Sequence, residues 1–192
     1  HEAAEPVDTA LLSMAERVAR DIPLDWGPWI TVASVDTGPE THEGQAGWVT
    51  VIGAAIGMDV ERFAESKLIL IWGSNAIASN LHFWTRAQEA KRRGARLVAI
   101  DPYRTATAEK CHEHIAPMPG TDAALAYALM HVLIRDGRVD RAYVQRYTVG
   151  YDALAERAAA WTPERAAALC RVPIAQIERL AHDLGTIRPS AI

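Results

Sequence analysis

The sequence has few of the features that mark a metal-cluster, membrane or nucleic-acid protein. Its 192 residues include two cysteines, Cys111 and Cys170, which lie far apart and form no CxxC pair, so neither a disulfide framework nor a zinc or iron-sulfur site is indicated. No apolar run reaches the roughly 20 residues that a membrane-spanning helix needs. The net charge of -4 gives no basic surface for nucleic acid. These absences leave an ordinary globular protein.

Two common nucleotide fingerprints are also missing. The turn after residue 72 reads GSNAIA, where a dinucleotide-binding domain would have GxGxxG, and the chain contains no GxxxxGK[ST]. The sequence therefore disfavours an ordinary NAD or ATP domain.

The first ten residues, HEAAEPVDTA, lack the charged and apolar parts of a signal peptide, and the chain starts at His. We therefore expect an excised piece of a longer chain, with any targeting signal outside it. This leaves localisation open between cytoplasm and periplasm.

Apolar periodicity predicts an α/β fold made of one domain over residues 1–192. Residues 67–72 and 95–100 are continuous apolar runs, typical of strands buried on both faces of a parallel sheet. A helix over residues 76–93, ended by Gly94, would join them into a βαβ unit. We expect an open, mainly parallel, Rossmann-like sheet with helices on both faces. The other predicted elements are helices at 8–20, 48–57, 59–66, 122–135, 140–146, 151–161 and from 162 and 174 onward, and strands at 30–35, 114–118 and near 188–192.

Polar residues follow three successive predicted strands. The loops read GSN from Gly73, DPYRT from Asp101 and PGTD from Pro119. In an open parallel sheet such loops converge beyond the carboxyl ends of the strands, where ligands bind. An acid at a strand end typically holds a ribose hydroxyl, an arginine can meet a phosphate, and a second acid can accept two N–H groups from a guanine edge. Together they predict a nucleotide site. Its candidate residues are Gly73, Ser74, Asn75, Asp101, Arg104, Gly120 and Asp122, with Thr105 beside Arg104.

Each loop also has a purely structural interpretation. Gly73-Ser74-Asn75 is typical of a helix N-cap, and Asp101-Pro102 commonly opens a turn. Thr121-Asp122 resembles a helix start with an acid favoured by the dipole. Recurrence at three strand ends favours the functional interpretation.

The run Cys111-His112-Glu113-His114 resembles a metal cluster at first sight. Alternate residues of a strand point to opposite faces, so at most two of the four share a side. Two ligands make a poor zinc site. The sequence therefore assigns no metal ligand here, and it identifies no catalytic acid or base.

The combination WGSN, IDPYRT and PGTD, in this order and spacing, resembles the molybdopterin oxidoreductases of the dimethyl sulfoxide reductase type, which include formate dehydrogenases and nitrate reductases. The resemblance covers roughly two thirds of the chain. It implies a domain that binds the guanine dinucleotide part of a bis-molybdopterin guanine dinucleotide cofactor with molybdenum or tungsten. Gly73, Ser74 and Asn75 would line the cofactor, Asp101 and Arg104 would hold its ribose and phosphates, and Gly120 with Asp122 would address the guanine.

The same resemblance implies further parts outside this chain. These are other domains of the same enzyme, a second dinucleotide half, usually a 4Fe-4S cluster, and an electron-transfer subunit as partner. Family members also supply a metal ligand from the loop upstream of the GSN strand. That loop has no cysteine here, and Ser34 and Asp36 are its candidate oxygen ligands, although Asp36 also suits a turn before Gly38-Pro39.

Two functions follow as hypotheses. The leading one is the cofactor-binding domain of a molybdenum or tungsten oxidoreductase that performs two-electron or oxygen-atom transfer. The alternative, motivated by the missing cysteine, is a non-catalytic nucleotide-binding or subunit-interaction module that has lost the metal site.

Overall fold

A computed structural model describes residues 60–192 of the chain. The predicted helices at 8–20 and 48–57, the strand at 30–35, and Ser34 with Asp36 all lie outside the described residues. The short helical piece expected at 59–66 is the 3-10 helix η2 (Val60–Glu65).

Four parallel strands form the central sheet, in the order β3-β2-β1-β4. Leu70 of β1 lies opposite Val98 of β2, and Ile100 of β2 lies opposite Ile115 of β3. Residues 68–71 and 97–100 are buried, as continuous apolar runs predict for a sheet covered on both faces. The strands are β1 (Leu68–Trp72), β2 (Arg96–Ile100), β3 (Glu113–Ile115) and β4 (Ser190–Ala191). The predicted parallel α/β sheet is confirmed.

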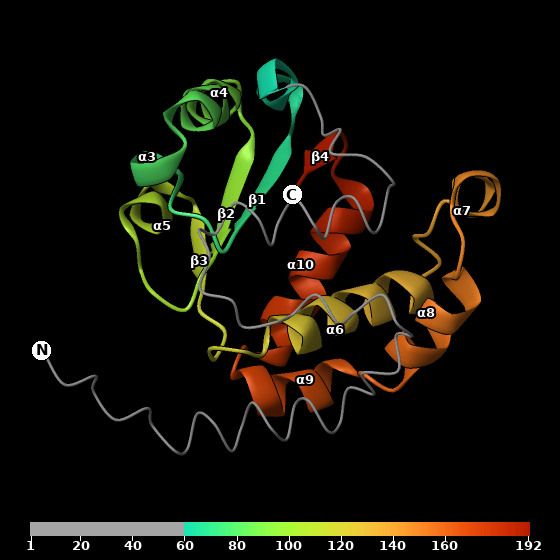
Figure 1. The fold of residues 1–192 in the computed structure, drawn as a ribbon. Helices are drawn as coiled ribbons and strands as arrows, with labels where there is room; N and C mark the ends of the chain where they lie inside the picture. The colour runs from blue at the N-terminus through green and yellow to red at the C-terminus, as the bar shows by residue number, and fades with distance from the viewer. Residues whose placement is uncertain (1–59) are drawn as a thin grey trace, which may run out of the picture. The chain divides into compact units, whose positions relative to one another are not determined.

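Side chains of β1 alternate between two hydrophobic cores. Leu68 and Leu70 belong to a core shared with α6, α9 and α10, whereas Ile69 and Ile71 belong to a smaller core shared with α4. This alternation is the two-residue period of a strand. Helices therefore cover both faces of the sheet, as predicted (Figure 1). The helices named here are α4 (Leu81–Arg92), α6 (Asp122–Arg135), α9 (Pro163–Cys170) and α10 (Ile174–Thr186).

The single helix predicted over residues 76–93 is wrong in one respect. The chain forms two helices, α3 (Ala76–Ser79) and α4, with a break at Asn80, whose backbone has φ -147° and ψ 70°. The Asn80 side chain accepts a hydrogen bond from the backbone N–H of Phe83 at 3.1 Å and so caps α4. An Asn side chain readily accepts hydrogen bonds from nearby backbone N–H groups, so it favours the N-cap position. This explains why a new helix begins after Asn80. The predicted end is confirmed, since Gly94 follows α4 with φ 95°.

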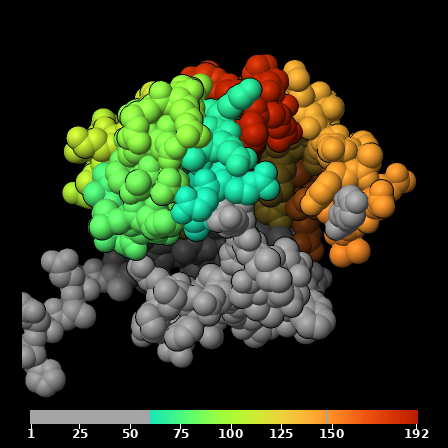
Figure 2. Space-filling view, turned by 90° about the horizontal axis from the view of Figure 1, so that it is seen from above, coloured from blue at the N-terminus to red at the C-terminus, as the bar shows by residue number. Residues whose placement is uncertain are grey.

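Three further helices complete the described part of the chain. α5 (Ala106–Lys110), which periodicity did not predict, follows the loop after β2. α7 (Arg141–Tyr147) and α8 (Tyr151–Ala159) follow α6, close to the predicted ranges. In the space-filling view, η2 lies directly beside α4 (Figure 2). Among residues 60–192, no helix has both the length and the apolar character needed to cross a membrane.

Candidate functional site

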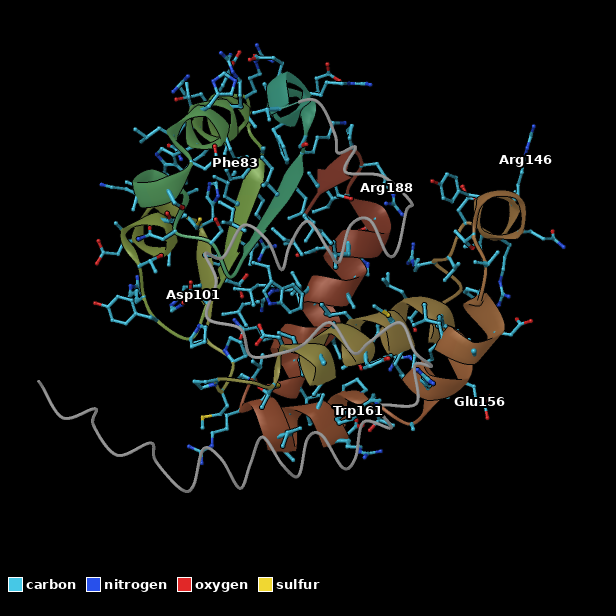
Figure 3. All side chains as sticks on the ribbon, in the orientation of Figure 1. Phe83, Asp101, Arg146, Glu156, Trp161 and Arg188 are labelled. Atoms are coloured by element: carbon cyan, nitrogen blue, oxygen red, sulfur yellow. The ribbon has the colours of Figure 1, made fainter. Side chains whose placement is uncertain are left out.

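The three polar loops start at one edge of the sheet. The backbone N–H of Gly73 donates to the carbonyl of Ile100 at 2.8 Å, and that of Asp101 donates to the carbonyl of Ile115 at 3.0 Å. These bonds extend the strand pairing by one residue each and hold the first loop against the second and the second against β3. Asp101 lies at this end of the sheet, beyond β2 (Figure 3). The sheet thus gathers the loops as parallel topology predicts.

Gly73 and Gly120 have backbones that favour glycine. Their φ angles are +62° and +77°, in the left-handed region, and a Cβ added at either would meet no heavy atom within 4 Å. Each glycine is therefore required by conformation and not by crowding within the described residues. In the described part of the chain, no atom fills the space beside either glycine.

The predicted N-cap position of the first loop is confirmed, but its own side chain does not form the capping bond. Asn75 occupies the N-cap position of α3, but its side chain makes no capping hydrogen bond. The buried hydroxyl of Thr107, from α5, instead accepts from the backbone N–H of Ile77 at 3.0 Å and donates to Oδ1 of Asn75 at 2.9 Å. A residue 30 positions along the chain therefore caps α3 and engages the Asn75 side chain, while Ser74 lies half-buried between Gly73 and Asn75.

The second loop combines a turn with groups that remain available. Oδ1 of Asp101 accepts from the backbone N–H of Tyr103 at 2.8 Å, so the predicted Asp-Pro turn is confirmed. A ring nitrogen of His114 lies 2.8 Å from the Asp101 carbonyl and ties the loop to β3. Within residues 60–192, no group bonds the second carboxylate oxygen of Asp101. The Arg104 side chain is exposed, and the Thr105 hydroxyl caps α5 by accepting from the Ala108 N–H at 3.1 Å.

The third loop leads into α6, the longest helix at this edge. Asp122 is its first residue, as predicted, and Oδ1 of Asp122 accepts from the indole Nε1 of Trp72 at 2.6 Å. The Thr121 hydroxyl donates to the carbonyl of Met118 at 2.6 Å rather than capping the helix. Because Trp72 immediately precedes Gly73, the hydrogen bond brings Asp122 to the start of the first loop.

Trp72 and Thr107 are site residues that the sequence did not reveal. Both contact a predicted residue through a side chain, over 50 and 32 positions of sequence respectively. In the sequence neither residue stands out as functional, because a Trp at a strand end and a Thr in a short helix commonly have structural roles. What distinguishes Thr107 is a polar side chain with no exposed surface, which only the tertiary structure provides.

Side chains of the run from Cys111 to His114 form contacts other than metal coordination. Nδ1 of His112 accepts from the Leu97 N–H at 2.9 Å, and Glu113 pairs with Arg96. Burial raises the pKa of Cys111 to about 11, with Lys91 opposing, so its thiol resists the ionisation that metal binding needs. Within residues 60–192, no three His, Cys, Asp or Glu side chains gather as a metal site would require.

The groups at this edge suit a ligand with mixed polarity. The Asn75 amide and the Arg104 guanidinium can donate, the Asp101 and Asp122 carboxylates can accept, and Gly73 leaves room for close approach. A nucleotide has matching parts: phosphate oxygens to accept, and ribose hydroxyls and base N–H groups to donate. The residues present therefore fit the nucleotide end of a cofactor.

Comparisons with known proteins indicate the family of this chain. A family model described as molybdopterin oxidoreductase matches residues 32–178. A probable oxidoreductase, YoaE, of Bacillus subtilis is 37% identical over 149 residues, covering 78% of this chain and 22% of that protein. The F420-dependent formate dehydrogenase subunit alpha of Methanocaldococcus jannaschii is 33% identical, covering 72% of this chain and 20% of that protein.

A solved structure of a related protein shares this fold. Acetylene hydratase from Pelobacter acetylenicus superposes with a TM-score of 0.60 at 27% identity, covering 68% of this chain and 20% of that chain. The present chain therefore spans about a fifth of the length of these relatives. With a family match over most of its length and a shared fold, the chain belongs to the molybdopterin oxidoreductases.

Proposed function

We propose that this chain binds the guanine dinucleotide part of a bis-molybdopterin guanine dinucleotide cofactor within a larger molybdenum or tungsten oxidoreductase. The observation that carries the proposal is the convergence of three polar loops at one sheet edge in a chain of this family. When bound, such a cofactor supplies two-electron or oxygen-atom transfer at its metal, and the protein supplies binding and orientation.

Each loop has its own part in holding the nucleotide. Gly73, Ser74 and Asn75 line it, because among the described residues no atom lies within 4 Å of a Cβ added at Gly73. Asp101 and Arg104 hold the ribose and phosphates, since a carboxylate accepts from hydroxyls and a guanidinium pairs with phosphate. Gly120 allows the guanine to approach the backbone closely, and Asp122 accepts from the guanine N–H groups.

The relatives' names mention formate dehydrogenase and acetylene hydratase. Because these names imply different substrates, we base the proposal on the cofactor rather than on a substrate. A 4Fe-4S cluster, the remaining domains and an electron-transfer subunit belong to the same proposal, as parts of the whole enzyme.

The test uses the full-length protein with Asp101→Ala and Asp122→Ala, singly and together. We expect the double variant to purify with much less guanine nucleotide, released by acid and measured by chromatography, and with less metal. Asp136→Ala is the matched control, because Asp136 lies just after α6, at the end away from the three loops, and forms a surface pair with Arg135. Unchanged nucleotide content in the double variant would show that the proposal is wrong.

The alternative is a nucleotide-binding or subunit-interaction module without a metal. The cysteine-free loop that contains Ser34 and Asp36 favours it. Metal analysis of the intact protein separates the two functions: molybdenum or tungsten near one atom per chain supports the oxidoreductase, whereas guanine nucleotide with neither metal supports the module.

A further inference from the structure

A short hydrogen-bonded chain links α3, α5 and the first polar loop. The backbone N–H of Ile77 donates to Oγ1 of Thr107 at 3.0 Å, and the Thr107 hydroxyl donates to Oδ1 of Asn75 at 2.9 Å. Thr107 has no exposed surface, whereas Asn75 is half-buried at the rim. A buried hydroxyl thus connects the core of the domain to a residue of the candidate site.

The direction of these two hydrogen bonds determines which atom of the Asn75 amide faces Thr107. A threonine hydroxyl has one proton, and here its oxygen already accepts from a backbone N–H that can only donate. In the structure this proton is directed to Oδ1 of Asn75, at 2.9 Å. It follows that the amide nitrogen points the other way, and within residues 60–192 no group accepts from it. Asn75 accordingly presents a donor to whatever occupies the site.

We propose that Thr107 is a positioning residue for the cofactor: it orients Asn75 so that the Asn75 amide nitrogen donates to a phosphate oxygen of the bound nucleotide. The inference rests on the proposed function and deepens it. A phosphate is the acceptor that fits best, because Thr107 holds Asn75 against α5 and the loop before α5 carries Arg104. Hydrogen bonds to a charged acceptor are stronger than neutral ones, so a preset donor strengthens binding.

A purely structural role for Thr107 makes a different prediction. If the hydroxyl only caps α3, its loss lowers stability and leaves nucleotide affinity unchanged in the protein that remains folded. If it also orients Asn75, its loss weakens nucleotide binding beyond what the lost stability explains. Affinity and melting temperature must therefore be measured on the same variants.

The experiment uses full-length protein freed of cofactor, with guanosine diphosphate as the probe in calorimetric titrations. Thr107→Val keeps the shape of the side chain and removes the hydroxyl, and we expect it to raise the Kd about tenfold. Thr107→Ser restores the hydroxyl and should restore the affinity. Thr162→Val is the matched control, because Thr162 caps α9 by accepting from the Arg165 N–H at 3.3 Å and lies outside the three loops. It should lower the melting temperature and leave the Kd unchanged.

Asn75→Asp tests the donor itself and does not depend on removing a buried group. An aspartate oxygen can still accept from Thr107, so α3 keeps its cap, but the variant replaces the donor with a negative charge. We expect its Kd to rise by more than tenfold. A Kd within twofold of the unchanged protein would overturn the donor assignment, and a Thr107→Val protein that behaves like Thr162→Val would overturn the positioning role.

Asp122→Ala distinguishes this failure from failure of the proposed function. If Asp122→Ala abolishes binding of guanosine diphosphate while Thr107→Val leaves it intact, only the present inference falls. If the unchanged protein does not bind the probe, and Asp122→Ala does not change the guanine nucleotide content of the purified protein, the proposed function is wrong. The present inference is then wrong as well.

Discussion

The indole Nε1 of Trp72 donates a 2.6 Å hydrogen bond to Oδ1 of Asp122, joining the last residue of β1 to the first residue of α6. Trp72 also packs against the larger hydrophobic core. The indole ring is therefore held by the core, while its polar edge holds the carboxylate that we assign to the guanine.

Trp72→Phe should separate these two contributions. Phenylalanine keeps an aromatic ring against the core but has no donor, so Asp122 loses a charge-assisted hydrogen bond. We expect the free energy of unfolding to fall by about 1–3 kcal/mol, measured by urea denaturation, and guanine nucleotide content to fall because the carboxylate is less fixed. An unchanged nucleotide content at reduced stability would limit Trp72 to a structural role.

Gly73→Ala should damage binding more than stability. Its positive φ imposes a strain of about 1–2 kcal/mol on alanine, and the new methyl group would enter the open space beside the first loop. Gly137→Ala is the control, because Gly137 has φ +64° and equally open surroundings but lies after the far end of α6. Both variants should lose similar thermal stability, and only Gly73→Ala should lose guanine nucleotide. Equal nucleotide content in the two would contradict the placement of the cofactor at Gly73.

Asn80→Ala should weaken the junction between α3 and α4. It removes the acceptor for the Phe83 N–H and leaves the first turn of α4 without its side-chain cap. We expect a loss of about 1 kcal/mol in the free energy of unfolding, whereas Asn80→Asp, which keeps a capping oxygen, should lose little. Equal losses from the two variants would mean that the cap contributes nothing.

Glu113 is the centre of an ionic network between the sheet and α10. It accepts from Arg96, Arg179 and Gln176, and Arg96 also pairs with Asp183 of α10 at 2.6 Å. Burial alone would raise the pKa of Glu113, but the hydrogen bonds from Gln176 and Arg96 and the charges of both arginines outweigh it and hold the pKa below its usual range.

Glu113→Gln should therefore give a pH-dependent loss of stability. A carboxyl whose pKa is lowered by folding stabilises the protein fully above its unfolded pKa, about 4.3, and loses that contribution as pH falls through the folded pKa. At pH 7 we expect a loss of about 1–3 kcal/mol, and the difference from the unchanged protein should shrink below about pH 4.

The matched control for Glu113→Gln is Glu65→Gln. Glu65 forms an exposed pair with Arg62 at 3.4 Å, and such pairs contribute little. Melting temperatures over the pH range test both variants, and a Glu113→Gln difference that stays constant down to the acid limit would show that the charge of Glu113 is not what stabilises α10.

The apolar runs at residues 67–72 and 95–100 were sufficient to predict the centre of the sheet. A continuous run of this length is buried on both faces, and two such runs separated by a helix form a parallel pair. The positions of the three polar loops followed from this topology. Prediction failed at Asn80, because a helical pattern on both sides of a capping residue hides the break, and at α5, which is too short to show a period.

The sequence alone determined the parallel α/β fold, the order of the loops and the family resemblance, since these depend on local pattern and spacing. Only the tertiary structure decided how the candidate side chains are held. Asn75 was expected to line the cofactor or to cap its own helix, yet Thr107 caps that helix and turns the Asn75 amide, and Trp72 engages Asp122. Such contacts join residues 30 to 50 positions apart, and no local period records them because they exist only once the sheet has brought its strand ends together.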